Sequence, residues 1–388
     1  IISLSMKTIA VLGSTGSIGR QTLEVLRAHP ELGHVGALCA HGNAELLLAQ
    51  ALAFRPALVG IADEAAADVL RPYLPEGTHL EVGPQAATVA AALTEVDTVV
   101  NGVSGFAGTE PLLAALRAQK TVALANKESI VCAHKLVDEA LRHGGKIVPV
   151  DSEQSAIFQC LCGGAHSEVK RLWLTASGGP FRTLPKERLC AVTAEDALHH
   201  PTWSMGAKIT IDSATLFNKG LEIMEASYLF GIDGARISVL VHPESIVHSM
   251  VEFSDSSVLA QLSRPDMRLA IHYALAWPAR MPSAFGALNL AEAGKLTFEA
   301  PDEERFPSIP LAYAALAEGE VLPIAYNAAN EAAVARFRSG EIGFCGVFHA
   351  VEYAMAHISR GTIRTFADIL ETDREARSLA EKAMEKKI

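Results

Sequence analysis

Apolar runs of strand length alternate with helical patterns over the first 150 residues. The run from Ile9 to Leu12 leads into a glycine-rich turn and then into a helical pattern, and further strand-like runs recur with alanine- and leucine-rich helical stretches between them. The later strand-like runs read VGALCA, ALVGIA, DTVVNGV, TVALAN and KIVPVD. Strands that alternate with helices indicate βαβ units on a parallel sheet. Residues 6–150 are therefore predicted to form a Rossmann-like, doubly wound α/β domain.

The pattern changes after residue 151. The strand-like pieces RLWLTAS, KITID, ISVLVH and SMVEFSDSSVLAQLS suit a mainly antiparallel sheet with helices on one face, so residues 151–276 are predicted to form an α+β domain. Residues 277–305 are rich in proline and glycine and are predicted to be a linker. Residues 306–388 carry amphipathic helical patterns and are predicted to form a small helical bundle. Residues 1–5 precede Met6 and are expected to be a non-native leader outside the fold.

Composition and charge exclude several classes of protein. The chain has 388 residues, of which 49% are hydrophobic and 20% charged, as in globular proteins of two or three domains. Its formal charge is −11 without a long basic run, which argues against general binding to nucleic acid or to an anionic membrane. No apolar run has the length of a membrane span and no signal peptide is recognised, so a cytoplasmic location is the default expectation.

The six cysteines form no CxxC pair, and neither a zinc knuckle nor a local redox motif is indicated. We therefore expect reduced, mostly buried thiols.

The glycine-rich turn GSTGSIG places Gly13, Gly16 and Gly19 between a predicted strand and a predicted helix. Such a turn lets a pyrophosphate approach the free N–H groups of the helix, although a tight structural turn would use the same residues. The second strand runs into LCAHGNAE, and it lacks the acid that usually holds the ribose of NAD. The absence of this acid favours NADP, but the segment after the second strand has no lysine or arginine to pair with a 2′-phosphate.

Two acids in VPVDSEQSAIFQ, Asp151 and Glu153, follow the last predicted strand of the parallel sheet. Ligands of such sheets bind at the carboxyl ends of the strands, whereas a solvated strand end is the alternative interpretation. A divalent cation needs further oxygen ligands. A helix predicted over residues 212–230 offers Glu222, with Asn218 and Lys219 one turn earlier, although a solvated Lys–Glu pair would look the same.

Two further stretches have features of an anion site, and a third has features of a lid. Ser177 precedes two glycines in TASGGPF, a turn that can expose backbone N–H groups. Ser213 in IDSAT is predicted to be the N-cap of a helix, which favours an anion, although capping alone would explain it. The segment HHPTWSMGAK at 199–208 has the composition of a lid, with His200 and Trp203, although a lone tryptophan is more often a packing anchor.

Several of these motifs occur together in one order that resembles a known family. The motifs are GSTGSIG, LANKES, VPVDSEQSAIFQ, SGGPF, HPTWSMGAKITIDSATLFNKGLEIMEA, HPESIVHSMVEF, LAQLSRPDMR and NAANEAAVARF. From Met6 onward the chain strongly resembles the 1-deoxy-D-xylulose 5-phosphate reductoisomerases. This resemblance implies rearrangement of a ketose phosphate and reduction by NADPH to 2-C-methyl-D-erythritol 4-phosphate, in non-mevalonate isoprenoid biosynthesis, by a homodimer whose second domain carries catalysis, metal binding and dimerisation.

The resemblance also implies a role for each matching residue. The residues implied to hold Mg²⁺ or Mn²⁺ are Asp151, Glu153 and Glu222. Those implied to bind the substrate or to act in catalysis are Lys127, Asp151, Ser152, Glu153, Ser177, His200, Trp203, Ser213, Asn218, Lys219 and Glu222. Those implied to bind the cofactor are Thr15, Gly16, Ser17, Ile18, Asn43, Asn126, Glu128 and Gly206.

One position departs from the family pattern. Many members carry a basic residue where Gly42 stands here, after His41. We hypothesise that His41, together with Asn43, contacts the 2′-phosphate instead.

Two rival functions are a semialdehyde dehydrogenase and a non-catalytic NADP-sensing or scaffold protein. The first needs a cysteine nucleophile, and no cysteine here lies in an SxCxxN context; retention of the three acids and the phosphate-binding set argues against the second.

Overall fold

The structure is a computed structural model that describes residues 6–203 and 205–385. Its contacts divide the chain into two compact units, which are described separately. Unit 1 contains the residues up to Ser129, Leu136–Ser155 and Asp266–Gly286, and unit 2 contains Ile130–Lys135, Ala156–Pro265 and the residues from Ala287. Helices α6 (Lys127–Leu141) and α7 (Ser152–Leu161) contribute residues to both units.

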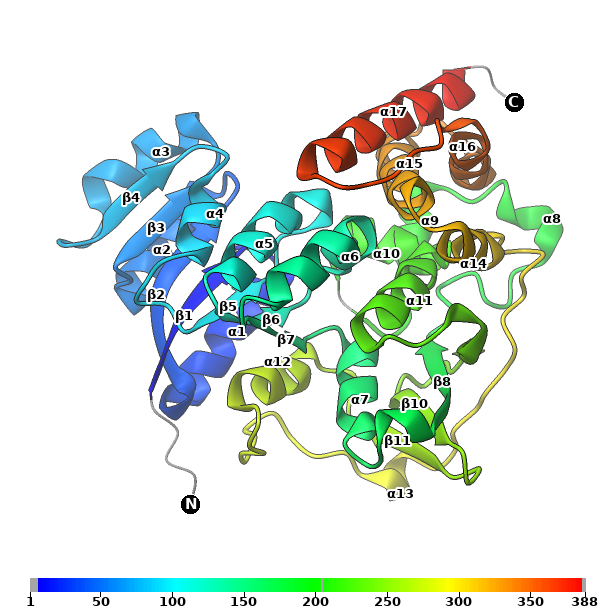
Figure 1. The fold of residues 1–388 in the computed structure, drawn as a ribbon, viewed down its shortest axis with the longest axis horizontal. Helices are drawn as coiled ribbons and strands as arrows, with labels where there is room; N and C mark the ends of the chain where they lie inside the picture. The colour runs from blue at the N-terminus through cyan, green and yellow to red at the C-terminus, as the bar shows by residue number, and fades with distance from the viewer. Residues whose placement is uncertain (1–5, 204, 386–388) are drawn as a thin grey trace. The chain divides into compact units, whose positions relative to one another are not determined.

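Unit 1 is built on a parallel sheet with the strand order β4-β3-β2-β1-β5-β6-β7, which the labels of Figure 1 follow. The strands are β1 (Lys7–Leu12), β2 (Gly33–Ala40), β3 (Leu58–Ile61), β4 (His79–Val82), β5 (Thr98–Asn101), β6 (Thr121–Leu124) and β7 (Lys146–Pro149). The predicted doubly wound sheet is confirmed. Because the chain crosses from β1 outward in both directions, the carboxyl ends of β1 and β5 flank the switch point at which such sheets bind ligands.

Helices cover this sheet and complete the core of unit 1. They are α1 (Ser17–Ala28), α2 (Ala44–Phe54), α3 (Glu64–Leu70), α4 (Ala86–Ala91), α5 (Thr109–Arg117) and α12 (Met267–Ala276), together with parts of α6 and α7. Strand β1 is fully buried from Ile9 to Leu12, as a central parallel strand should be. Helix α12 returns late in the sequence to pack against α1, and Lys7 Nζ donates to Leu275 O at 2.6 Å.

Unit 2 contains a four-stranded sheet with the order β11-β10-β8-β9. Its strands are β8 (Val169–Ala176), β9 (Ile237–Val241), β10 (Val247–Phe253) and β11 (Val258–Leu262). Strand β10 is antiparallel to β8 and β11, while β8 and β9 are parallel. The mainly antiparallel sheet that the sequence predicts is therefore present, with one parallel pair at its edge.

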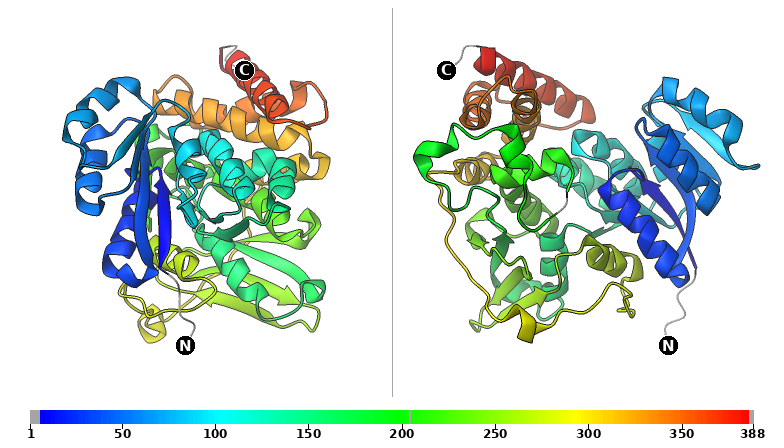
Figure 2. Two further views of the ribbon diagram at one scale, coloured as in Figure 1. Left: turned by 60° about the vertical axis from the view of Figure 1, so that its left-hand side comes forward. Right: turned by 180° about the vertical axis from the view of Figure 1, so that it is seen from behind.

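Helices make up the rest of unit 2. They are α8 (Lys186–Leu189), α9 (Ala194–Leu198), α10 (Ala207–Ala214), α11 (Phe217–Phe230), α13 (Leu290–Ala293), α14 (Ser308–Glu318), α15 (Val321–Arg338), α16 (Phe344–His357) and α17 (Phe366–Glu385). Helices α14 to α17 form the predicted C-terminal bundle, drawn in orange to red in Figure 2, and α15 packs against both α16 and α17. None of the helices in the described ranges combines the length and apolar character needed to cross a membrane.

Two expectations about residues 208–230 are wrong. The β-branched run KITID, predicted as a strand, lies in helix α10, where Lys208 pairs with Asp212 one turn away at 2.7 Å. The Thr210 hydroxyl also donates to Gly206 O at 2.8 Å. Tertiary burial and local hydrogen bonds therefore override the strand propensity of this run. The helix predicted over 212–230 is interrupted, because Leu216 adopts the left-handed conformation with φ 57° between α10 and α11.

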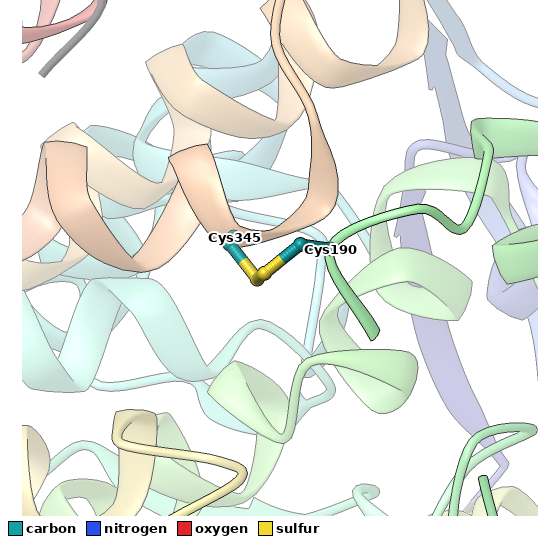
Figure 3. The surroundings of a disulfide bond; sticks show 2 residues. All are labelled: Cys190 and Cys345. Atoms are coloured by element: carbon teal, nitrogen blue, oxygen red, sulfur yellow. A yellow bond between two sulfur atoms is a disulfide. The ribbon is translucent and has the colours of Figure 1, made fainter. Parts of the chain in front are cut away.

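The expectation that all cysteines are reduced is also wrong. Cys190 and Cys345 form a disulfide with a Cα–Cα distance of 5.0 Å, and Figure 3 shows it joining the segment after α8 to helix α16. The two residues are 155 positions apart, so the absence of a CxxC motif excludes only local pairs and cannot reveal this one. The remaining cysteines are Cys39, Cys132 and Cys160, which are buried, and Cys162, which is exposed.

Candidate functional site

The glycine turn after β1 leaves no room for side chains. Gly13 has φ +72°, and a Cβ there would lie 2.7 Å from Gly102 O. A Cβ on Gly19 would lie 2.3 Å from Gly13 O, so the first turn of α1 packs directly on the loop. Helix α1 begins at Ser17 without a side-chain cap, so its first N–H groups keep their capacity to bind a ligand. The turn is a cradle for an anion at the carboxyl end of β1.

A buried pair of side chains fixes this turn. The Ser14 hydroxyl donates to Gln50 Oε1 at 2.8 Å, and Gln50 Nε2 donates to Ser14 O at 2.9 Å. Both residues are buried, and Gln50 comes from α2. Sequence reasoning missed Gln50. The available signal was one glutamine within the otherwise apolar helix LLLAQALAF.

The loop after β2 is exposed and holds His41, Gly42 and Asn43. The Asn43 side chain caps α2 by accepting from Leu46 N at 3.1 Å. A Cβ on Gly42 would lie 3.3 Å from Asp63 Oδ2, so a carboxylate from the end of β3 stands beside this loop. The sequence shows no acid at the end of the second strand, because the acid beside this loop, Asp63, follows the third strand.

Asn126 and Glu128 lie where β6 ends and α6 begins. Asn126 Oδ1 accepts from Ser129 N at 2.9 Å, which caps α6, and its Nδ2 donates to Val103 O and Gly105 O, both at 2.7 Å. Glu128 Oε2 lies 3.2 Å from the same amide nitrogen. Asn126 therefore holds the loop after β5 against the start of α6, at the carboxyl edge of the sheet.

Lys127 and Asp151 come together at the same edge. The Lys127 side chain is buried, and its Nζ lies 3.2 Å from Asp151 Oδ2. Asp151 lies two residues after the end of β7, and Ser152 and Glu153 open helix α7, so all three lie at the junction between strand and helix. Each of the three is half-buried. A strand end that is merely wetted by solvent would not hold a buried lysine against one of its acids, so the solvated alternative is not supported.

Asn218, Lys219 and Glu222 cluster on the first turns of α11 in unit 2. Both Lys219 Nζ and Asn218 Nδ2 donate to the Glu222 carboxylate. Glu222 is fully buried and Lys219 is 2% exposed, so the solvated helix face that the sequence allowed is wrong. A buried carboxylate is stable only with charge compensation and hydrogen bonds, and Lys219 and Asn218 supply both.

The turn after β8 lies directly against Ser213. Gly178 and Gly179 have φ +83° and +67°, and a Cβ on Gly179 would lie 2.6 Å from Ser213 O. The two predicted anion-binding stretches are therefore neighbours in unit 2. Ser213 is not an N-cap, however, because it lies in the last turn of α10 and Leu216 precedes α11.

His200 is oriented so that the Ser177 hydroxyl keeps its own proton available. His200 Nδ1 accepts from Thr202 N at 3.1 Å and from Trp203 N at 2.9 Å, so the neutral ring carries its proton on Nε2. Burial lowers the pKa of His200, which favours this neutral form. Its Nε2 lies 2.9 Å from Ser177 Oγ, which also accepts from Gly179 N at 3.3 Å. Ser177 thus accepts two bonds and can donate to a ligand.

The segment predicted as a lid joins His200 to helix α10. Trp203 is half-buried, with its ring centroid 6.2 Å from that of His248. Gly206 is exposed and is the N-cap residue of α10, and a Cβ at this position would meet no atom of the described residues within 4 Å. Because His200 contacts Ser177, this segment begins beside the turn that follows β8.

Comparisons with known proteins match nearly the whole chain. Family models described as 1-deoxy-D-xylulose 5-phosphate reductoisomerase, its C-terminal domain and the DXP reductoisomerase C-terminal domain match residues 9–134, 147–230 and 262–379, respectively. The 1-deoxy-D-xylulose 5-phosphate reductoisomerase of Chlorobaculum tepidum is 48% identical over 379 residues, covering 97% of this chain and 99% of that protein. That of Bacteroides fragilis is 45% identical over 379 residues, covering 97% and 98%.

Solved structures agree with these sequence matches. The Zymomonas mobilis 1-deoxy-D-xylulose 5-phosphate reductoisomerase in complex with NADPH is 42% identical with a TM-score of 0.92, covering 98% of this chain and 100% of that chain. A DOX-P reductoisomerase in complex with NADPH, fosmidomycin and magnesium is 37% identical with a TM-score of 0.92, covering 98% of each chain. The chain therefore belongs to the 1-deoxy-D-xylulose 5-phosphate reductoisomerase family.

Proposed function

We propose that this protein is an NADPH-dependent oxidoreductase that converts 1-deoxy-D-xylulose 5-phosphate to 2-C-methyl-D-erythritol 4-phosphate with a divalent metal ion. The observation that carries the proposal is the group Asp151, Glu153 and Glu222, whose carboxylates could hold one ion. Family membership over nearly the full length of the relatives supports the same reaction. The pathway that this reaction serves would be non-mevalonate isoprenoid synthesis.

The donor set fits Mg²⁺ or Mn²⁺. Hard divalent cations prefer carboxylate oxygens, and three such groups supply about half of an octahedral shell and leave positions for substrate oxygens and water. A bound ion would stabilise the oxyanion that develops while the carbon skeleton rearranges. Lys127 beside Asp151 and Lys219 beside Glu222 place a positive charge against each of these two acids.

The glycine cradle fits the pyrophosphate of NADPH, which supplies the hydride for the reduction. The Cβ clashes at Gly13 and Gly19 mean that this surface is bare backbone, and the first N–H groups of α1 point along the helix axis toward it. The residues proposed to bind NADPH are Thr15, Gly16, Ser17, Ile18, His41, Gly42, Asn43, Asn126, Glu128 and Gly206.

The phosphate of the substrate is proposed to bind in unit 2. Ser177 offers a hydroxyl proton because its oxygen accepts from His200 and Gly179. Ser213 lies against the same turn, and Lys219 adds a positive charge that a dianion needs. The residues proposed to hold the phosphate are Ser177, Ser213, Asn218 and Lys219, with His200 and Trp203 covering the sugar chain.

Lys127 and Ser152 are proposed to orient the substrate hydroxyls beside the acids. The buried Lys127 ammonium carries several N–H donors next to Asp151, and Ser152 stands between Asp151 and Glu153 in the chain. Fixing both fragments of a breaking and re-forming carbon–carbon bond prevents their separation. This explains why an acid, a hydroxyl and an acid follow one another where β7 ends.

A homodimer is also proposed, in line with the family resemblance. Strand β11 is the edge of the unit 2 sheet, and its Val258 and Leu259 are 47% and 41% exposed. An apolar sheet edge of this kind is normally covered or paired.

The test is NADPH oxidation, followed by absorbance, with 1-deoxy-D-xylulose 5-phosphate and Mn²⁺. We expect NADPH consumption that a chelator abolishes and that added Mn²⁺ restores. A folded protein that consumes no NADPH with this substrate would overturn the proposed reaction.

Glu222→Gln separates the metal site from the cofactor site. The amide keeps the shape of the side chain but removes the charge that binds the ion, so turnover should fall by at least about 1,000-fold. NADPH binding, measured by fluorescence titration, should stay within about twofold because Glu222 is not among the residues proposed to bind the cofactor. A Glu222→Gln protein with full activity would refute the assignment of this acid to the metal.

A further inference from the structure

The motif NAANEAAVARF lies on helix α15, and the proposed function gives it no role. Its residues Asn327 and Asn330 are both fully buried, although neither lies in the proposed substrate site. Asn330 Nδ2 donates to Asp212 Oδ1 at 2.9 Å, across the contact between α15 and α10, which Figure 1 shows side by side. A hydrogen bond between fully buried groups of two helices specifies their relative position.

Asp212 is the residue directly before Ser213, and both of its oxygens are engaged. Oδ1 accepts from Asn330, and Oδ2 pairs with Lys208 Nζ at 2.7 Å. Asp212 is 1% exposed, so a lost partner would leave charge uncompensated in the interior. The carboxylate thus fastens the last turn of α10, which carries Ser213, to the C-terminal bundle.

A second buried chain of bonds reaches the same junction between α10 and α11. Tyr326, also on α15, donates to Ser308 O at 3.0 Å, and the Ser308 hydroxyl donates to Thr215 O at 2.7 Å. Burial and the charge of Asp212 raise the pKa of Tyr326, so its hydroxyl keeps the proton it donates.

The same tyrosine also fixes the start of α11. A Cβ on Gly220 would lie 1.8 Å from the Tyr326 hydroxyl oxygen, so glycine is required directly after Lys219. Leu216 holds a left-handed conformation between the two helices, a geometry that persists only when the surroundings impose it. Contacts from α15 thus reach both sides of the interruption.

We propose that Asp212 and Asn330 are positioning residues for the substrate phosphate, through which the C-terminal bundle sets the place of Ser213 and the start of α11. The inference rests on the proposed function, because it takes Ser213, Asn218 and Lys219 as phosphate ligands. A displacement of these groups by about 1 Å weakens binding and catalysis even though the substituted residue does not touch the substrate.

The primary test compares Asn330→Ala with Asn327→Ala. The two positions have the same residue type, helix and burial, but Asn327 Nδ2 donates to Glu331 Oε1 within α15, at 3.2 Å. We expect Asn330→Ala to raise KM for 1-deoxy-D-xylulose 5-phosphate by about 10- to 100-fold. KM for NADPH should stay within about twofold. Asn327→Ala should leave both KM values within about twofold.

An exchange of partners tests the bond itself. Asp212→Asn and Asn330→Asp should each raise KM for the sugar phosphate at least about 10-fold, the second because it places two carboxylates in contact. The double exchange restores one carboxylate and one amide in reversed order, so its KM should recover to within about fivefold of the wild-type value. This recovery is a readout that general loss of stability cannot produce.

The outcomes separate the inference from the proposed function. A wild-type protein without activity on this substrate would contradict the reaction itself. An active wild-type protein would contradict the positioning role if Asn330→Ala left KM for the sugar phosphate unchanged, if Asn327→Ala raised it equally, or if the double exchange gave no recovery. Circular dichroism and NADPH titration show whether each variant is folded, and a variant that does not fold is replaced by Asn330→Ser.

Discussion

His41 stands at the end of β2 in a stretch of chain without a permanent positive charge. No lysine or arginine occurs from residue 29 to residue 54, and the carboxylate of Asp63 lies beside Gly42. A 2′-phosphate near this loop therefore meets one negative group, and His41 is the nearest side chain in sequence that can offset it. Selection between NADPH and NADH at such a site depends on a few groups around one ribose.

We expect His41→Ala to lower the ratio of kcat/KM for NADPH to kcat/KM for NADH by about 3- to 10-fold, because one charge-assisted hydrogen bond is lost. Steady-state kinetics with each cofactor at saturating sugar phosphate give the ratio. His79→Ala serves as the control, since this residue is an exposed histidine on β4 of the same unit. An unchanged ratio in His41→Ala would show that another group holds the 2′-phosphate.

The break between α10 and α11 illustrates what a sequence pattern can and cannot predict about elements. The apolar runs predicted strands β1, β2 and β3 because buried parallel strands are nearly continuous in apolar residues. Strand β4 (HLEV) was not predicted, since an edge strand with His79 and Glu81 lacks that pattern. The left-handed Leu216 was not predicted either, because the residues that flank it, Thr215 and Gly220, contact α14 and α15, which lie far along the chain.

The sequence also predicted some features of the candidate site and not others. Asp151 and Glu153 could be found from their place after an apolar run. The i, i+3 and i, i+4 spacing predicted that Asn218, Lys219 and Glu222 lie together on one turn, and in the structure the first two donate to the Glu222 carboxylate. The full burial of Glu222 could not be predicted, because the covering residues come from distant segments. Ser14 and Gln50 pair across 36 positions, a separation at which spacing carries no information.

The Cys190–Cys345 disulfide ties the short segment after α8 to helix α16. It closes a loop of 155 residues within unit 2, and the chain-entropy model assigns about 5 kcal/mol of stability to a loop of this length. We expect Cys190→Ser/Cys345→Ser to lower the free energy of unfolding by that amount in urea titrations. Reductant should destabilise the wild-type protein and leave the double variant unchanged. Equal stability of the oxidised wild-type protein and the variant would show that the bond adds nothing.

The stability of the whole molecule should fall in mild acid because buried and half-buried histidines must become charged. Burial lowers the pKa of His134, His200 and His272. For His134 the pKa falls to about 4, with its ring stacked on Tyr228 at a centroid distance of 3.9 Å. Between this value and the ordinary 6.5, the unfolded chain binds a proton that the folded chain does not, so acid favours unfolding.

The pH range between about 4 and 6.5 determines the sign and the size of the change in unfolding free energy. Above pH 6.5 neither state is protonated at His134 and the residue contributes no pH dependence, whereas the loss grows as the pH falls and reaches about 3 kcal/mol near pH 4. We expect His134→Gln to reduce the slope of unfolding free energy against pH between 6.5 and 5, measured in urea. His143→Gln, at an exposed position, should keep the wild-type slope. Parallel curves for His134→Gln and the wild-type protein would mean that the half-buried ring is protonated in the folded state, with its charge compensated by groups around α6 and α11.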